Sequence, residues 1–502
     1  MATTTGEQDV LISERVAGGI LPKVLNSFDM VAIFVAIVLF ISNAGVVSGA
    51  GGAAYIFWVI GFLTFLIPGA IVTGQLGLMF PGEGSIYVWT HKAFGKFWGF
   101  FAGFCAWWPG VLVMVATGAA VVTLLTLLGA NHNQNWLAEP WQQGVVILLV
   151  IAFSMVLSWL RFRMAQNFVN LIFVAYGGAI LLVGLAGLFW IINGNTPTGD
   201  FTSAGWIPST GKWTFYGLVI LALLGIEVPL NMGVEIRNVR SITKYLFWGS
   251  IVVMAAYLIG TFGVQMTVPR AVQLQASPAA VGQAVQLGFG GAGTILSDVV
   301  LIVFIGFFLF NTAVYNYSFG RLLFVSGLDR RLPAAMSKVN RNRVPWVAVL
   351  VQTVIAALVT VLSYFLPYVF SGGASTLDLS TRVYDVLQAA VTVIWCISMV
   401  ILFVDVVIIR SKYREQFDAK QLVPPWVFYV CSVIGLVASA VGIVVTFLNP
   451  WTTSVSERDW WEILAIIAVA SLIVGAVVYF IGEVTIGKTA PPETPTEVAP
   501  AS

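Results

Sequence analysis

The chain has 502 residues, of which 59% are hydrophobic and only 9% are charged. Soluble domains carry about 25% charged residues, so this composition excludes an ordinary soluble protein and indicates a membrane protein. The formal net charge is only +2, and we expect no nucleic-acid partner.

Apolar segments of helical length recur along almost the whole chain. About 20 consecutive apolar residues are enough to cross the hydrocarbon core as an α-helix. We predict an all-α integral membrane protein in contact with membrane lipid. Its twelve spans are predicted at residues 28–50, 54–79, 97–128, 143–160, 166–192, 214–236, 245–267, 294–325, 345–367, 382–410, 425–447 and 460–482.

Lys and Arg are distributed unevenly between the two faces that these spans define. An even number of spans places both termini on one face, and 20 of the 24 basic residues fall there. The other face receives only Lys212, Arg270, Arg382 and Arg458. The positive-inside rule then predicts a multi-pass protein of the cell membrane with both termini in the cytoplasm.

The sequence lacks the motifs of the common enzyme classes. It contains no nucleophile elbow or phosphate loop, and its two histidines lack the spacing of metal ligands. We therefore expect no enzymatic activity, no cofactor and no metal site. The three cysteines lie within apolar spans, where a disulfide framework is not expected.

The sixth predicted span is interrupted near its middle by Gly225, Ile226, Glu227, Val228 and Pro229. A carboxylate at that depth costs about 2.5–3.5 kcal/mol. Glycine loosens a helix and proline removes a hydrogen-bond donor, and freed backbone groups are tolerated only where they face protein or a watery cavity. The pattern favours a substrate or ion site over a kinked packing helix, and replacing both Gly225 and Pro229 with Ala should favour a continuous helix.

The first predicted span carries a second break, at Ser42, Asn43, Ala44 and Gly45. Interrupted helices at corresponding positions of two five-span halves are typical of inverted-repeat transporters. Half-helix N-termini offer N–H groups to an anion, and half-helix C-termini offer carbonyls to a cation. An amino acid carries both charges. We predict that its carboxylate meets N–H groups around Asn43 to Gly45 and that its amine lies near carbonyls around Leu224 and Gly225.

Three motifs in the correct order resemble the amino acid–polyamine–organocation superfamily. GIEVPLNMGVEIRNVR is similar to the family's sixth-span signature, although Val239 stands where the family prefers Pro. PGEGSIYVWTHKAFG, from Pro81, resembles the segment after the second span, and RLLFVSGLDRRLP, from Arg321, resembles the loop between spans 8 and 9. The resemblance covers roughly residues 25–450.

The resemblance implies a LeuT-like fold of two inverted five-helix repeats and transport by alternating access. We accordingly expect a cytoplasmic segment at 1–26, a transporter core at 27–411, peripheral spans at 412–486 and a disordered cytoplasmic tail at 487–502. Some family members carry a lysine in span 5 that substitutes for sodium, but span 5 here contains none. Sodium coupling, proton coupling and simple exchange therefore all stay open.

Further polar and aromatic residues are candidates for the site. Trp107 in span 3 and Tyr315 in span 8 could contact a substrate ammonium through their ring faces. Glu227 is the predicted coupling residue, because a carboxylate that loses its water binds a proton more readily. Glu83 and Lys92 are expected to pair in a cytoplasmic loop, and Asp405 is expected to be solvated.

The sequence therefore predicts a secondary active transporter, acting as a permease or antiporter for an amino acid or related amine. Two alternatives stay open at this point. The substrate could be a polyamine or organic cation without a carboxylate, although acids are scarce in the core. The chain could also be a membrane scaffold that has lost transport, although the two helix breaks argue against this.

Overall fold

The computed structural model describes residues 10–274, 279–366, 377–451 and 455–485. Within these residues, eleven helices are long and apolar enough to cross a membrane. The bent pair Ser27–Val38 and Ser42–Ala50, with 43° between its two parts, supplies a twelfth span. The prediction of twelve membrane-spanning helices is confirmed. The predicted disordered tail at 487–502 lies outside the described residues.

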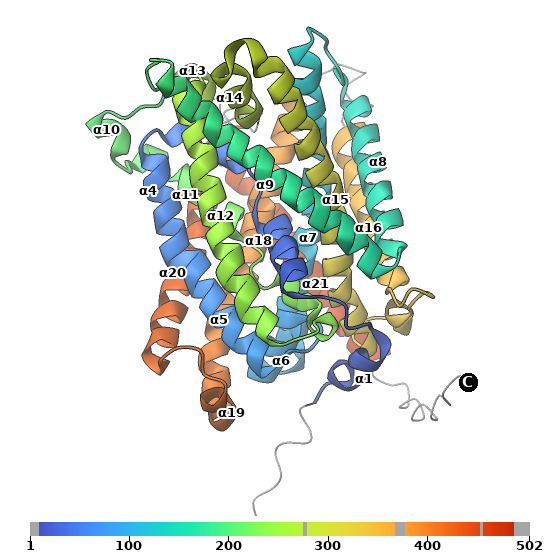
Figure 1. Ribbon diagram of the computed structural model, residues 1–502. Helices are drawn as coiled ribbons and strands as arrows, with labels where there is room; N and C mark the ends of the chain where they lie inside the picture. Colours follow the sequence, from blue (N-terminus) through green and yellow to red (C-terminus); the bar gives the residue numbers. More distant parts are fainter. Residues whose placement is uncertain (1–9, 275–278, 367–376, 452–454, 486–502) are drawn as a thin grey trace, which may run out of the picture.

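The helices follow one another with short connections (Figure 1). Those of the first half are α1 (Ile12–Ile20), α2 (Ser27–Val38), α3 (Ser42–Val47), α4 (Ala53–Gly61), α5 (Ile67–Met79), α6 (Ser85–Phe94), α7 (Lys96–Asn131), α8 (Pro140–Trp159), α9 (Phe162–Ile192) and α10 (Ser203–Trp206). Those of the second half are α11 (Thr214–Leu223), α12 (Arg240–Thr267), α13 (Arg270–Gln273), α14 (Ala280–Gly288), α15 (Gly293–Leu328), α16 (Trp346–Thr360), α18 (Leu377–Lys412), α19 (Arg414–Ala419), α20 (Pro425–Leu448) and α21 (Glu457–Thr485).

Several tighter or wider turns interrupt or join these helices. The 3-10 segments are η1 (Ser48–Ala50), η3 (Thr210–Lys212), η4 (Val228–Asn231), η5 (Gly233–Glu235), η6 (Gly290–Ala292) and η7 (Ala334–Ser337). The π-helical turns are η2 (Phe62–Leu66), which joins α4 to α5, and η8 (Val361–Phe365), which follows α16.

Helices α7 and α15 form the centre of the bundle. Each has 36 residues and they pack along one another. Helix α12 packs on α2 and α9, while α18 packs on α7 and α20. The interior between these helices is filled by apolar side chains such as Phe34, Trp58 and Phe319, all fully buried. This close packing holds both interrupted spans inside the bundle.

Span 1 begins at a well-defined helix cap. The Asn26 side chain accepts hydrogen bonds from the N–H groups of Phe28 and Asp29 at 2.9 and 3.0 Å, and Asp29 Oδ2 accepts from the Asn26 N–H at 2.8 Å. Such a reciprocal cap satisfies two N–H groups that the helix itself cannot. Asp29 is fully buried and also binds Asn170 and Arg163 of α9. The start of span 1 is thereby fastened to span 5.

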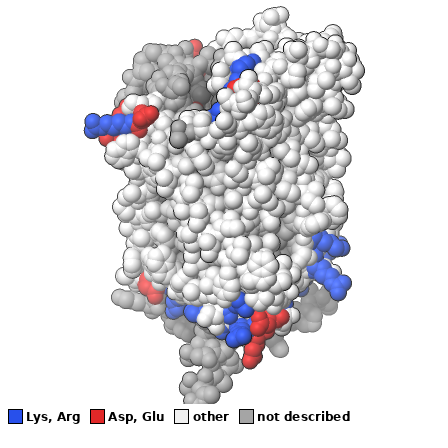
Figure 2. All heavy atoms as spheres, turned by 90° about the vertical axis from the view of Figure 1, so that its left-hand side faces the viewer, with Lys and Arg blue, Asp and Glu red and all other residues white. Residues whose placement is uncertain are grey.

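Charged side chains concentrate at the two ends of the bundle. Figure 2 shows an uncharged band between a lower end rich in Lys and Arg and an upper end with few charges. The lower end carries α1, α6 and α19, and the upper end carries α10, α13 and α14 (Figure 1). We call the lower end the basic face and the upper end the opposite face. An apolar band of this kind is what a lipid bilayer requires.

Candidate functional site

The breaks in spans 1 and 6 lie in direct contact inside the bundle. The first lies at Leu39 to Ile41, between α2 and α3, and so just before the predicted Ser42–Gly45, which form the start of helix α3. In span 6, α11 ends at Leu223 and is followed by non-helical residues. Gly225 has φ +102°, a conformation that favours glycine. A Cβ on this residue would lie 2.4 Å from Ile37 Cγ2 of span 1. Only a glycine therefore allows this approach between the two spans.

Tyrosine side chains satisfy the backbone groups that the first break frees. The Tyr315 hydroxyl, from α15, donates to the Ile37 carbonyl at 2.7 Å. The Tyr176 hydroxyl, from α9, donates to the Leu39 carbonyl at 3.2 Å and accepts from the Ile41 N–H at 3.0 Å. Each unsatisfied backbone group in hydrocarbon would cost several kcal/mol. These tyrosines therefore stabilise the break without water.

A third tyrosine joins the two breaks to each other. The Tyr257 hydroxyl, from α12, accepts from the Phe40 N–H at 3.1 Å. It also lies 2.8 Å from the Val38 carbonyl oxygen and 3.0 Å from that of Ala222, at the end of α11. One hydroxyl proton thus serves a carbonyl of span 1 and a carbonyl of span 6. Any relative movement of the two breaks must change this contact.

Glu227 lies buried at the second break with one carboxylate oxygen free. Its Oε1 accepts from the Trp395 Nε1 of α18 at 2.9 Å, while Oε2 has no hydrogen-bond partner among the described residues. The Trp395 ring meets Phe319 edge-on with centroids 5.5 Å apart, and Phe319 stacks on Tyr315 at 5.3 Å. An aromatic chain therefore links the carboxylate to the tyrosine that holds the first break.

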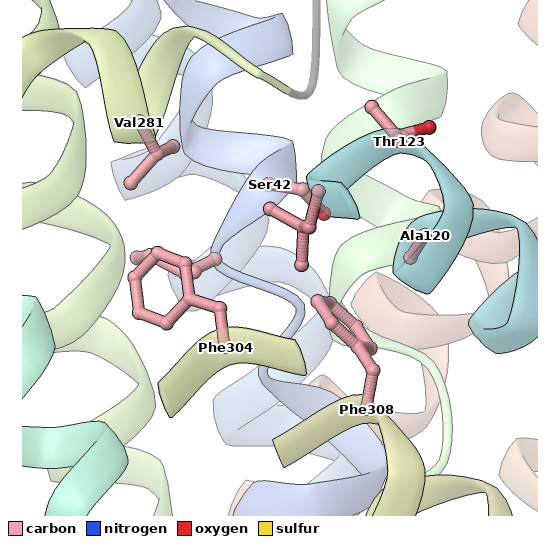
Figure 3. Close-up of a pocket in the computed structure, with 8 residues that line it drawn as sticks. Ser42, Ala120, Thr123, Val281, Phe304 and Phe308 are labelled. Carbon is pink, nitrogen blue, oxygen red and sulfur yellow. The ribbon is translucent and has the colours of Figure 1, made fainter. Parts of the chain in front are cut away.

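The hydroxyl of Ser42 lies beside a small hollow at the start of α3. This hydroxyl is buried and has no hydrogen-bond partner among the described residues. Figure 3 shows Phe304 and Phe308 of α15, Val281 of α14 and Thr123 of α7 around it. The hollow has a volume of about 10 Å³, roughly the space for one water molecule. An amino acid does not fit there unless these side chains separate.

The N–H groups of Asn43 and Ala44 are engaged in this conformation. They donate to the carbonyls of Phe40 and Ile41, each at 2.9 Å. A substrate carboxylate near α3 would have to compete with these bonds, whereas the Ser42 hydroxyl is available at once. The polar group at the first break that is ready for a ligand is therefore Ser42.

The remaining predicted site residues divide into two groups. Ala44, Gly45, Leu224 and Ile226 are buried beside the two breaks. Trp107 is not brought to them: it lines an apolar groove of about 460 Å³ between α7, α15, α16 and α21.

Trp107 is linked to the helix beside the breaks through Gln352 of α16. Its Nε1 donates to the Gln352 Oε1 at 3.0 Å, and the Gln352 amide donates to the Tyr315 carbonyl at 3.3 Å. The indole therefore supports the backbone of α15 beside the site. Sequence reasoning did not find Tyr176, Tyr257 and Trp395, because no local pattern distinguishes them from the many packing aromatics of this chain.

Two predictions about charged residues were wrong. Lys92 pairs with Glu14 at 3.0 Å, and Glu83 pairs instead with Arg321 of α15 at 3.3 Å. Asp405 is fully buried, and its Oδ2 accepts from the Thr90 hydroxyl of α6 at 2.6 Å. Helix α6 lies across the bundle near its basic face and excludes water from these groups. Among the described residues, no group of three or more His, Cys, Asp or Glu side chains is arranged to hold a metal ion.

Comparisons with known proteins agree with this architecture. The family described as amino acid permease matches residues 24–480. An uncharacterized transporter of Legionella pneumophila is 25% identical over 339 residues, 66% of this chain and 72% of that protein. The probable agmatine/putrescine antiporter AguD of Lactococcus lactis is 24% identical over 353 residues, 68% of this chain and 72% of that protein. The gamma-aminobutyric acid permease of Bacillus subtilis is 24% identical over 343 residues, which are 66% of this chain and 69% of that protein.

A solved structure supports the fold. The crystal structure of MhsT in complex with L-phenylalanine superposes with a TM-score of 0.63 at 13% sequence identity, covering 85% of this chain and 99% of that one. The predicted LeuT-like fold and the resemblance carried by the three sequence motifs are both confirmed.

The contact between the breaks yields a prediction for Gly225→Ala. The new methyl group would collide with Ile37 and lies in a backbone conformation that strains an L-residue, so we expect a loss of about 1–3 kcal/mol in stability. From the sequence we expected alanine at Gly225 and Pro229 to favour a continuous helix, but the structure indicates that alanine at Gly225 would strain the backbone and collide with Ile37. Thermal unfolding in detergent measures the effect.

The matched control is Gly178→Ala on α9. Nothing lies within 4 Å of a Cβ there, and alanine favours a helix over glycine by about 1 kcal/mol. This variant should unfold at the same or a higher temperature. Equal behaviour of the two variants would contradict the close contact between the breaks.

Proposed function

The chain belongs to the amino acid permease family, and on this premise we propose how it carries an amino acid or related amine across the cytoplasmic membrane. Two interrupted spans meet in the middle of the bundle, where the buried Ser42 hydroxyl and Glu227 Oε2 have no hydrogen-bond partner among the described residues. Buried polar atoms without a partner are costly, and a polar ligand held between the two breaks would supply one to each. This pairing of unsatisfied groups is the observation that carries the proposal. We propose transport alone, with no enzymatic step.

We propose that the basic face is the cytoplasmic face. Of the 24 Lys and Arg residues, 20 belong to the segments assigned to that face, and such an excess is typical of cytoplasmic loops. Both termini then lie in the cytoplasm, the core comprises residues 27–411, and the spans in 412–486 are peripheral.

We propose that the substrate lies between the breaks with a defined orientation. Its carboxylate binds the Ser42 hydroxyl and the N-terminal end of α3, within Ser42 to Gly45. Its amine binds the carbonyls near Leu224 and Gly225, with Glu227 Oε2 as the nearby acid. The half-helix dipoles favour this orientation. From the sequence we expected the carboxylate to bind backbone N–H groups of Asn43 to Gly45. Here the Ser42 hydroxyl is the first donor to the carboxylate.

The conformation described here is closed around this site. Phe304 and Phe308 lie over Ser42 from the opposite face, and the hollow that they leave is smaller than any amino acid. We propose that α14 and the outer half of α15 move away from α3 to admit substrate. Closure around a bound substrate is a common conformational step in such cycles.

A polyamine or other organic cation is the second candidate substrate, and AguD, a probable agmatine/putrescine antiporter, is among the relatives. A dication would favour two acids at the site, whereas Glu227 is the sole acid among the site residues assigned above. The unpaired Ser42 hydroxyl also favours a substrate that carries an acceptor group. We therefore favour an amino acid.

The substrate proposal is tested by uptake of radiolabelled amino acids into proteoliposomes, with and without internal amino acid. Decarboxylated analogues should compete at least about tenfold more weakly than their parent amino acids, because they lack the group that binds Ser42. Dependence of uptake on internal amino acid identifies exchange. Analogues that compete equally well would instead support the polyamine alternative.

Ser42→Ala should weaken amino-acid binding by about tenfold in the same assay, because a hydrogen bond to a charged group contributes about 1.5–3 kcal/mol. Ser48→Ala is the matched control, since the Ser48 hydroxyl already donates to the Ala44 carbonyl at 2.7 Å. Ser48→Ala should bind substrate normally. Equal losses in both variants would place the substrate carboxylate elsewhere.

We propose that Glu227 couples transport to protons. Glu227→Gln keeps an oxygen to accept from Trp395 and resembles the protonated carboxyl, so the variant should fold and transport with a flattened dependence on pH. Glu462→Gln, at an exposed carboxylate that pairs with Arg458, is the control and should keep the wild-type profile. An unchanged profile in Glu227→Gln would make Glu227 structural and leave sodium coupling or simple exchange.

A further inference from the structure

A buried triad of charged residues lies between the site and the basic face. Arg321 of α15, Glu83 of the loop before α6 and Glu235 of η5 all have side chains with 0% exposure. Arg321 Nη2 lies 2.8 Å from Glu235 Oε1, and Arg321 Nε lies 3.3 Å from Glu83 Oε1. The guanidinium also lies over the Phe162 ring, 5.5 Å from its centroid. Two acids thus share one base, with all three side chains buried.

The triad has one negative charge more than it can pair. Two nearby carboxylates are held by other groups, since Glu14 pairs with Lys92 and Asp29 pairs with Arg163, and Asp329 at the end of α15 accepts from the N–H and hydroxyl of Ser13. A buried charge without a partner is strongly disfavoured. Binding one proton makes the triad neutral.

The environment of Glu83 supports proton binding. Burial, and after it the neighbouring Glu235 carboxylate, raise the pKa of Glu83 well above its usual range, against the opposing effects of Arg321 and the Val234 N–H. Glu83 Oε2 accepts only from that N–H, at 3.2 Å, and Glu235 Oε2 has no partner among the described residues. An oxygen able to hold a proton is therefore present.

The triad also joins the chain segments that close the bundle at the basic face. The N–H groups of Val24 and Leu25, just before span 1, both donate to the Glu235 carbonyl at 2.9 Å. The Ser85 hydroxyl donates to Asn231 Oδ1 at 2.6 Å, so the start of α6 is bound to span 6 as well. The ion pair between Arg321 and Glu235 joins α15 to this segment of span 6, so separating the two elements breaks the pair and exposes the triad to water.

We propose that this triad is a second proton-binding site, distinct from Glu227, which holds one proton while the transporter is closed at the basic face and releases it to that side on opening. The proposal rests on the proposed function only in requiring that α15 and span 6 separate during the cycle. Because the proton returns to the same side on closing, the site regulates opening and carries no net proton flux.

The sign of the pH dependence follows from this arrangement. Below the ordinary pKa of a glutamate, about 4.3, Glu83 is protonated whether the bundle is open or closed, so closure carries no electrostatic penalty. As the pH rises toward the raised pKa of Glu83, the open form ionises in water while the closed form must keep its proton. Acid on the basic face therefore holds the bundle shut, and alkali favours opening.

The proposal is tested by labelling a thiol placed behind the triad. Ser318, on α15 one turn from Arg321 toward the membrane interior, is fully buried with its hydroxyl 3.9 Å from Met232 Sδ. A Ser318→Cys chain in oriented vesicles is treated with a membrane-impermeant thiol reagent on the basic face from about pH 5.5 to about 8.5. The chain without Ser318→Cys gives the background from the three native cysteines.

We compare two variants at each pH: Ser318→Cys alone, and Ser318→Cys combined with Glu83→Gln. The informative quantity is the labelling rate of the first divided by the labelling rate of the second. This ratio cancels the pH dependence of the thiol itself. Because the exposed acid of the open form is already ionised above about pH 4.3, we expect the ratio to exceed one at the acid end of this range. It should rise with pH by up to about tenfold per unit, because Gln resembles the protonated acid. Glu235→Gln should act in the same way, and it replaces Glu83→Gln if that variant does not fold. A change of pH on the opposite face should have no effect.

Glu14→Gln is the matched control, because it removes a nearby carboxylate that pairs with Lys92 and does not contact Arg321. The corresponding ratio for Glu14→Gln should stay flat. A flat ratio for both Glu83→Gln and Glu235→Gln, or an equal rise for Glu14→Gln, would overturn the proposal. Labelling needs no substrate, so an error in the proposed substrate class would appear in the uptake assay and leave this result unaffected.

Discussion

The structure depends on how the backbone of the first broken span is satisfied away from water. A helix break in an apolar bundle frees carbonyl and N–H groups that hydrocarbon cannot solvate. Here three tyrosine hydroxyls, from α9, α12 and α15, bind the segment between Ile37 and Ile41. Because each tyrosine comes from a different span, the break is held in place by tertiary packing and not by its own sequence.

This arrangement explains why the second break is where it is. Tyr257 contacts carbonyls of both broken spans, and Gly225 allows span 6 to approach Ile37 without a side chain between them. Within the described part of the chain, the Ser42 hydroxyl on one side and Glu227 Oε2 on the other lie at these breaks without a hydrogen-bond partner. Toward the opposite face the site is covered by apolar side chains, whereas toward the basic face it is closed by a buried charge cluster. The groups that close the site therefore differ in chemistry between the two faces. In our proposal only the charged cluster at the basic face makes opening depend on pH.

Hydropathy alone predicted the twelve spans within a few residues, because each must be long and apolar to cross a bilayer. Glycine, proline and polar residues inside apolar runs also predicted that spans 1 and 6 are broken and that Glu227 is buried. The first break lies at Leu39 to Ile41, because the predicted Ser42–Gly45 begin helix α3. Sequence could not show which aromatics bind the breaks, since that depends on the rotation of each helix, and Trp107 lies in a peripheral groove instead. Glu83 was assigned to the nearby Lys92, although its partner Arg321 is far away in sequence. Asp405 was expected to meet water because α6 was not foreseen to cover it.

In our proposal the substrate binds between the two broken spans. A structure determined with a bound amino acid, by crystallography or by electron cryo-microscopy, would show where the ligand lies. We predict ligand density between Ser42 and Gly225, with the carboxylate at the start of α3 and the amine toward Leu224 and Glu227. Density in the groove beside Trp107, or a ligand with the opposite orientation, would contradict the account.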